Sequence, residues 1–196
     1  MTHAPERVET PRLVLLRPRA DDRDAIFRTY ASDREVTRYL SWPVHVSVEE
    51  TRAFLSFSDR EWARWPAGPY LVFSRDGALL GGTGLAFESP EAAVTGYVFA
   101  RSAWGQGYAT EALTAMVQVA RASGVKVLYA VCHVDHRPSA HVLGKCGFEL
   151  EGVARQFAEF PNLSPGQRSD VLKFSRRLAP EGTSDRKYPV DPVAED

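Results

Sequence analysis

Cysteine is scarce in this chain, and neither sign of charge is in excess. Among 196 residues only Cys132 and Cys146 are cysteines, too few for a disulfide framework or a cysteine-rich metal cage. We expect both thiols to be reduced and partly buried, and we expect no metal site. Lysine and arginine number 24 against 25 aspartates and glutamates, a formal net charge of −1. Because this balance gives no polybasic face, nucleic acid is not an expected partner.

Long apolar runs are also missing. No stretch approaches the roughly 18–20 apolar residues that a membrane-spanning helix requires. The residues from Met1 to Arg7 are polar and do not resemble a signal peptide. We therefore expect a cytoplasmic protein with no membrane partner, and a length of 196 residues suits one domain with a substantial core.

Two nucleotide-binding motifs are absent around the glycines at positions 105 and 107. The Gly-Gln-Gly triplet at 105–107 lacks the third small residue of the dinucleotide fingerprint, and no early strand–helix–strand unit precedes it. The Tyr-Ala-Thr triplet at 108–110 stands where a P-loop requires Gly-Lys-Ser/Thr. Nucleotide hydrolysis and a Rossmann-type dinucleotide site are therefore disfavoured.

What is present at 104–113 is a glycine-rich turn between a strand-like run and a helical pattern. The first turn of a helix has free backbone N–H groups and the positive end of the helix dipole. Glycines without Cβ let a phosphate group approach those amides closely. The segment predicts a site for a phosphate-bearing ligand, although the same spacing also occurs in ordinary tight strand-to-helix turns.

Hydrophobic periodicity and turn residues predict an α/β (α+β) fold. The expected helices begin at Asp21 or Asp22 and run to about Tyr30, then cover 34–39, 48–64 after a Ser47–Glu50 capping box, 108–123 and 138–145. The expected strands cover 12–17, 70–74, 79–88, 92–100, 127–132, 148–160 and 168–178. Strands 92–100 and 127–132 should be parallel, because a helix crosses between them.

Three segments resemble the GNAT superfamily of N-acetyltransferases, in particular the branch that acetylates ribosomal-protein N-termini. Residues 9–18, ETPRLVLLRP, resemble the first strand of that branch. Residues 104–109, WGQGYA, resemble its pyrophosphate-binding loop. The segment 136–148, from His-Arg-Pro-Ser to Lys-Cys-Gly-Phe, resembles the family's Asn-x-x-Ser and Glu-Lys-x-Gly-Phe motifs.

The resemblance implies a GNAT domain over residues 8–178. Its fold would be a mixed central sheet of about seven strands with a splayed parallel pair and flanking helices. Residues 179–196 form a polar, proline-bearing tail, which we expect to be mobile and to add nothing to the core.

The same resemblance implies acetyl-CoA as the co-substrate. The pantetheine arm would lie between the splayed strands, where a backbone N–H of Phe99 would hold the thioester carbonyl and stabilise its oxyanion. His136 stands where the family usually has asparagine, so contact with CoA and simple loop packing are both open for it. The residues implied in cofactor binding are Tyr97, Val98, Phe99, Gly105, Gln106, Gly107, Tyr108, Ala109, Thr110, His136 and Ser139.

Ser139 is the candidate proton donor to the departing thiolate. Leu143 stands where many relatives carry a tyrosine in that role, so the usual donor is missing. A hydroxyl in the first turn of a helix can equally satisfy local backbone groups. The candidates for the general base are Glu88 and Glu159, which fit solvated surface carboxylates as well. A dedicated base is unnecessary if the amine has a usable neutral fraction.

Aromatic residues gather in the half of the chain that precedes the cofactor motifs. Such side chains can form an apolar slot for the acceptor amine, or they can simply belong to the core. The candidates for substrate contact are Tyr39, Trp42, Tyr70 and Phe157.

These observations predict direct transfer of an acetyl group from acetyl-CoA to a primary amine in a ternary complex. The expected partner is a small-molecule or peptide amine, including a protein N-terminal α-amine. The alternative is a non-catalytic acyl-CoA-binding or sensor module. Pairing of the terminal hairpin's edge in a homodimer stays open.

Overall fold

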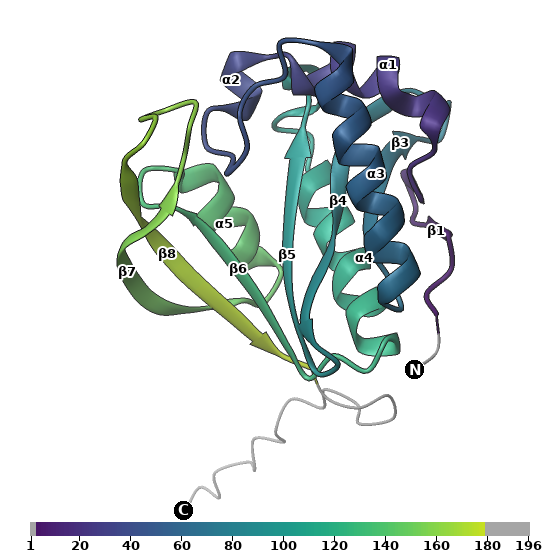
Figure 1. Cartoon of the computed structure of the whole chain (residues 1–196). Coiled ribbons are helices and arrows are strands. Elements are labelled where there is room, and N and C mark those ends of the chain that lie inside the picture. Colours follow the sequence, from purple (N-terminus) through teal and green to yellow (C-terminus); the bar gives the residue numbers. More distant parts are fainter. Residues whose placement is uncertain (1–2, 179–196) are drawn as a thin grey trace, which may run out of the picture.

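The computed structural model describes residues 3–178, so the expected tail at 179–196 lies outside the described residues. Eight strands form one mixed sheet in the order β1-β2-β3-β4-β5-β6-β8-β7 (Figure 1). The strands are β1 Arg7–Glu9, β2 Leu13–Leu16, β3 Pro69–Ser74, β4 Leu79–Ser89, β5 Ala92–Phe99, β6 Val127–His133, β7 Glu149–Glu159 and β8 Arg168–Arg177. The sequence predicts the seven longer strands, and the eighth is β1, a three-residue edge strand antiparallel to β2.

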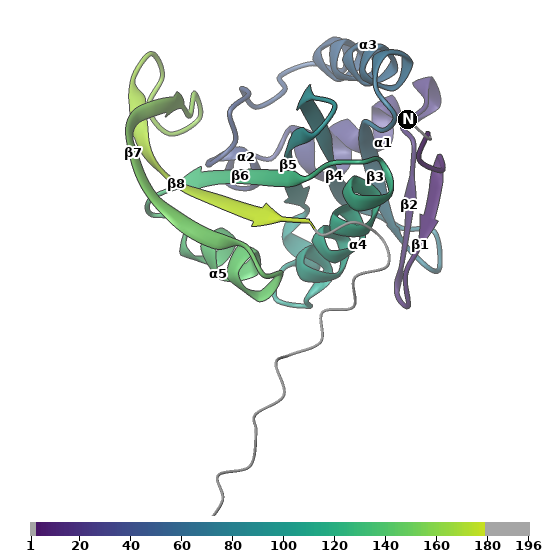
Figure 2. The ribbon, with the colours of Figure 1, turned by 90° about the horizontal axis from the view of Figure 1, so that it is seen from below.

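Helices cover both faces of the sheet. The α-helices are α1 Arg23–Ile26, α2 Arg34–Thr37, α3 Val48–Arg64, α4 Tyr108–Ala122 and α5 Arg137–Lys145. Figure 2 shows α1, α2 and α3 on one face of the sheet and α4 and α5 on the other. Within the described part of the chain, none of these helices is long and apolar enough to cross a membrane.

The longest helix forms as its sequence predicts. The Ser47 side chain and the Glu50 side chain exchange hydrogen bonds with each other's backbone N–H groups in a capping box at the start of α3.

Gly107 is the N-cap of α4 and has a φ of +79°, a left-handed conformation that favours glycine. This conformation turns the chain from the loop directly into the helix.

The expected helix from Asp21 or Asp22 to Tyr30 is wrong in detail. The structure has a 3-10 turn at Ala20–Asp22, the short α1 and then a π-helical turn at Phe27–Ala31. Both the backbone N–H and the hydroxyl of Ser32 donate to the Phe27 carbonyl, at 3.2 and 2.8 Å. The Phe27 carbonyl at the end of the wider turn therefore accepts from two donors of one residue.

Packing around α4 forms the main core. Leu113, Met116 and Val117 on this helix are almost completely buried, together with Leu13 and Leu128 from the sheet. A smaller cluster under α1 and α3 includes Ile26, Tyr30 and Leu71. The two clusters hold the central sheet between the helical layers.

The parallel pair β5–β6 separates soon after it begins. Its register covers only Ala92↔Val127, Ala93↔Leu128 and Val94↔Tyr129, although both strands continue beyond these residues. On their outer sides, β5 pairs with β4 along its whole length and β6 pairs with β8. The splayed parallel pair is thus confirmed, and each strand keeps its ladder only on the side away from the opening.

Candidate active site

A cavity of about 690 Å³ opens where β5 and β6 separate. It continues from the strand pair to α3 and to the segment between α2 and α3, so one space joins both halves of the fold. Of the residues predicted from the sequence to contact cofactor or substrate, those lining this cavity are Tyr39, Trp42, Tyr70, Tyr97, Val98, His136 and Ser139.

The unpaired side of β5 presents backbone groups to this opening. The Ala100 N–H donates to the Leu80 carbonyl of β4 at 2.9 Å, and N–H groups along a strand alternate in direction. The N–H groups of Tyr97 and Phe99 therefore point away from β4, toward the gap. The Phe99 carbonyl accepts a hydrogen bond from the Trp104 indole at 2.7 Å, and the Phe99 side chain is buried in the core.

Ser139 lies in the first turn of α5 beside the tyrosine of β5. The Tyr97 hydroxyl is 3.0 Å from the Ser139 hydroxyl and 3.2 Å from the Ser139 carbonyl oxygen. Leu143 is buried one turn further along α5 and also lines the cavity. A tyrosine hydroxyl is therefore present in this region, but β5 supplies it instead of α5.

Two neighbouring groups of the cavity stay protonated at neutral pH. Burial raises the pKa of the Tyr97 phenol well above its usual range, against a smaller lowering by the hydrogen bond with Ser139. Burial likewise raises the pKa of the Cys132 thiol, and its hydrogen bond with Ser139 lowers it less. Tyr97 can therefore donate to the Ser139 oxygen while the Ser139 proton points to a ligand.

The loop before α4 has the geometry of an anion cradle. Gly105 and Gly107 have φ values of +73° and +79°, and a Cβ on Gly105 would meet no atom within 4 Å. The first helical bond of α4 is donated by Glu111 to the Gly107 carbonyl. The N–H groups of Tyr108, Ala109 and Thr110 precede that bond and lie at the positive end of the helix.

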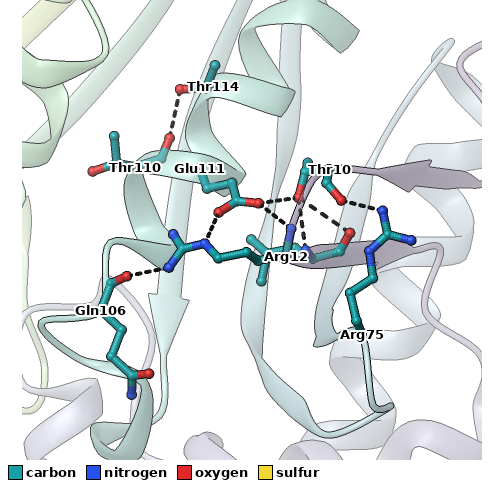
Figure 3. A network of polar contacts seen from close by, with 8 residues as sticks. Thr10, Arg12, Arg75, Gln106, Thr110, Glu111 and Thr114 are labelled. Atoms are coloured by element: carbon teal, nitrogen blue, oxygen red, sulfur yellow. Dashed lines mark hydrogen bonds and ion pairs between the residues drawn. The ribbon is translucent and has the colours of Figure 1, made fainter.

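The N-terminal segment fixes this loop through Arg12 and Glu111 (Figure 3). The Arg12 guanidinium donates to the Glu111 carboxylate at 2.6 Å and to the Gln106 carbonyl at 2.8 Å, and it lies 4.7 Å from the Tyr108 ring centroid. Glu111 also accepts from the Arg12 amide and the Thr10 hydroxyl, at 2.8 and 2.6 Å. Partial burial alone would raise the pKa of Glu111, but these hydrogen bonds hold it below its usual value.

Aromatic rings close the cavity on the side of α5. The Tyr39 ring stacks on His136 with centroids 4.6 Å apart, and Phe160 packs edge-on against His133 at 5.1 Å. Burial, with a further contribution from His133, lowers the pKa of His136, which is therefore a neutral imidazole at pH 7.

A single asparagine holds the chain segment that contains Tyr39 and Trp42. The Asn162 amide donates to the carbonyls of Thr37 and Trp42, both at 2.8 Å, and its oxygen accepts from the Val44 N–H at 2.7 Å. Asn162 therefore fixes the chain segment that forms this wall of the cavity.

Tyr70 lines the cavity mainly as a core residue. Its side chain is only 1% exposed, it packs edge-on against Trp62, and its hydroxyl donates to the Pro5 carbonyl at 2.8 Å. The hydroxyl is therefore occupied by the N-terminal segment and is not directed at a ligand.

Of the residues predicted as substrate contacts or as the general base, three do not line the cavity. Phe157 and Glu88 line a neighbouring cleft that shares Val94 and Val131 with the cavity, and the Phe157 ring is 5.9 Å from the Lys173 amine. The register of β7 with β8 shifts between Ala154 and Ala158, and in the residues that follow, Ala158 and Phe160 line the cavity while Phe157 does not. The Glu159 carboxylate accepts from the Gly166 N–H at 2.9 Å within its own hairpin.

Side chains that commonly bind metal ions lie apart from one another in the described structure. Across residues 3–178, no group of three or more histidine, cysteine, aspartate or glutamate side chains converges as ligands for an ion.

The chain belongs to the GNAT acetyltransferase family and is an acyltransferase. Residues 12–149 match the family described as "Acetyltransferase (GNAT) domain". YoaA of Bacillus subtilis strain 168, an uncharacterized N-acetyltransferase, is 31% identical over 160 residues, which is 76% of this chain and 86% of YoaA.

Solved structures with the same fold include ligand complexes. RimL, a ribosomal L7/L12 α-N-protein acetyltransferase solved with coenzyme A, has a TM-score of 0.76 and 26% identity, covering 88% of this chain and 98% of its own. MccE, a microcin C7 self-immunity acetyltransferase solved with acetyl-CoA and AMP, has a TM-score of 0.80 and 20% identity. The match covers 90% of this chain and 99% of the MccE chain. The likeness to MccE shows the fold alone.

Sequence reasoning missed three side chains that organise this site. The sequence indicates only a backbone contact for Tyr97, and the loss of a tyrosine at Leu143 was the signal that another hydroxyl was needed. Arg12 lies within the matching first-strand segment, but its partner Glu111 is 99 residues away. Asn162 lies in the turn before β8, where the sequence gives no sign of its contacts.

The Glu111 network generates a stability prediction. The pKa of Glu111 is lower in the folded protein than its ordinary value of 4.5. The ionised carboxylate therefore stabilises the fold above pH 4.5, and this stabilisation is lost as the pH falls through the lowered pKa. Glu111→Gln should therefore lower the free energy of unfolding at pH 7 by about 1–3 kcal/mol. In urea unfolding titrations, the difference in free energy of unfolding between the variant and the native protein should narrow below pH 4.5.

Glu149→Gln is the matched control, because Glu149 is exposed on β7 and its substitution should change the free energy of unfolding little. A Glu111→Gln variant as stable as the native protein at pH 7 would contradict the network's structural role.

Proposed function

We propose that this enzyme transfers acetyl from acetyl-CoA directly to a primary amine within a ternary complex. The observation that carries the proposal is the continuity of one cavity from the opening between β5 and β6 to the aromatic wall near α3, with Ser139 at the junction. Donor and acceptor can meet there without a covalent acyl-enzyme. Membership of the GNAT family favours this reaction over a non-catalytic acyl-CoA sensor.

The residues present fit acetyl-CoA, which supplies the activated acetyl group as a thioester. The loop from Gly105 to Gly107 and the first N–H groups of α4 would hold the pyrophosphate, since a Cβ at Gly105 would meet open space. The gap-facing N–H of Tyr97 would bond the pantetheine arm like a neighbouring strand. The gap-facing N–H of Phe99 would hold the thioester carbonyl and stabilise negative charge on its oxygen.

Ser139 would donate a proton to the departing sulfur. The Tyr97 hydroxyl, at 3.0 Å, orients the Ser139 oxygen and stays protonated because burial raises its pKa. As the Ser139 proton moves toward sulfur, the Tyr97 hydrogen bond stabilises the charge that develops on the Ser139 oxygen.

The attacking amine would reach the site already neutral. Glu88 and Glu159 lie outside the cavity, so neither is placed to take the proton in this conformation. A thiolate is a fair leaving group, so a neutral amine can attack without a strong base; the proton that nitrogen then loses passes to water, and water returns one to the Ser139 oxygen. A protein N-terminal α-amine is an acceptor of this kind, and RimL is described as an α-N-protein acetyltransferase.

Thiol release from acetyl-CoA in the presence of amines tests the function. Gly107→Trp should abolish turnover and weaken acetyl-CoA binding by at least about 100-fold, because the new side chain is strained at φ +79° and fills the cradle. Binding is measured by isothermal titration calorimetry.

Gly124→Trp provides the control for backbone strain. Gly124 follows α4 at its far end and has a φ of +88°, and a Cβ at this position would meet no atom within 4 Å. This variant should keep acetyl-CoA affinity and turnover. Equal affinity in the Gly107→Trp variant and the native protein would contradict the proposed phosphate site.

Ser139→Ala should lower kcat by about 10- to 100-fold with little change in the KM for acetyl-CoA. Tyr97→Phe should lower kcat less, by about 2- to 10-fold, because it removes one hydrogen bond. Since Tyr97 acts through Ser139, the double variant should be no slower than Ser139→Ala alone. Steady-state kinetics with all three variants provides the test, and independent, multiplicative losses would contradict the coupling.

A further inference from the structure

Helix α3 presents a second apolar stripe in addition to the one that it buries in the core. The residues buried in the core are Thr51, Leu55, Ser58 and Trp62. The residues that line the cavity are Glu50, Ala53, Phe54 and Phe57. Spacings of three and four place the second set on one side of the helix. This second set forms the part of the cavity wall that α3 contributes.

The cavity surface near α3 is apolar. Ile26, Leu40 and Trp42 join Phe54 and Phe57 around it. Phe57 is 42% exposed, so much of its ring is open to solvent in the free protein. A ligand with an apolar body would cover this ring and remove apolar surface from water, which is favourable in proportion to the area buried.

Acidic side chains are almost missing from the same wall. Among the described residues that line the cavity, Glu50 is the single acid, and there is no aspartate, lysine or arginine. One Glu50 oxygen already accepts the N–H groups of Val46 and Ser47, at 2.6 and 3.3 Å. Burial lowers the pKa of both His45 and His136, so these rings are neutral at pH 7, and a neutral imidazole is no counter-anion for an ammonium group.

This distribution of charge discriminates between kinds of amine. The single carboxylate of Glu50 can compensate one ammonium group at most, so any further ammonium group that enters the apolar cavity loses its hydration uncompensated. A polyamine or an aminoglycoside would bring several such groups. An acceptor with a single nitrogen reacts as the neutral amine and needs no counter-charge.

We infer that the acceptor is a primary amine attached to an apolar or aromatic body with no second positive charge. The inference rests on the proposed function and specifies its acceptor. Two sources supply this chemistry: a free arylalkylamine and a peptide whose N-terminal residue is apolar. Phe57 is the residue whose ring recognises the body of either one.

Competition among defined amines tests the inference. The panel contains phenethylamine, peptide amides beginning with phenylalanine or serine, spermidine and kanamycin. We expect kcat/KM for phenethylamine or the phenylalanine peptide to exceed that for spermidine and kanamycin by at least about tenfold. Whichever of the two apolar amines is better identifies the source.

Phe57→Glu places a carboxylate on the apolar wall. It should lower kcat/KM for the best apolar amine by at least about tenfold and raise that for spermidine, while the acetyl-CoA dissociation constant stays unchanged. Leu150→Glu is the matched control, because Leu150 is an exposed apolar residue on β7 that does not line the cavity. The Leu150→Glu variant should change neither the two kcat/KM values nor the acetyl-CoA dissociation constant.

The outcomes separate the inference from the function on which it rests. Equal or better turnover of spermidine or kanamycin would overturn the inference and leave acetyl transfer to amines intact. Tight acetyl-CoA binding without turnover of any amine in the panel would overturn both the proposed function and the inferred acceptor.

Discussion

The separation of β5 from β6 is the constraint on which the rest of the site depends. Pairing ends at Val94 and Tyr129, so the inner edges of two central strands lose their partners inside the sheet. Unpaired backbone groups away from water are costly, and a ligand with amide groups of its own can satisfy them. The hydrogen bonds of β5 with β4 and of β6 with β8 keep both strands in place, so the opening lies within one continuous sheet (Figure 1).

Two groups of long-range hydrogen bonds fix the chain at the two ends of this opening. At the end proposed to bind the phosphates, Arg12 and Glu111 tie the N-terminal segment to the loop before α4. At the end proposed to bind the acceptor, Asn162 holds the segment that contains Tyr39 and Trp42. Neither pair of contacts touches the Ser139 hydroxyl, yet each positions one binding surface relative to it. Preorganised surfaces of this kind lower the entropic cost of bringing two substrates together.

Local sequence signals predicted the elements well and the side-chain partnerships poorly. The Ser47–Glu50 box predicted the start of α3, and the helical pattern after the glycines predicted that α4 begins at Tyr108. The partner of Tyr97 could not be read from periodicity, because Ser139 is 42 residues away and meets it only after α4 and α5 have packed. Phe157 lies in an irregular part of β7, directly before Ala158, and it lines the neighbouring cleft instead of the cavity. Contacts set by tertiary packing have no local sequence signature.

Residue-resolved amide hydrogen exchange, measured by NMR with and without acetyl-CoA, tests the central claim most directly. The N–H groups of Val98 and Ala100 face β4 and should exchange slowly in both states, so they serve as internal controls. The N–H groups of Tyr97 and Phe99 face the opening and should exchange faster in the free protein and slow markedly when acetyl-CoA binds. Unchanged exchange at Tyr97 and Phe99 in the saturated complex would contradict the assignment of the gap between β5 and β6 as the site of the thioester arm.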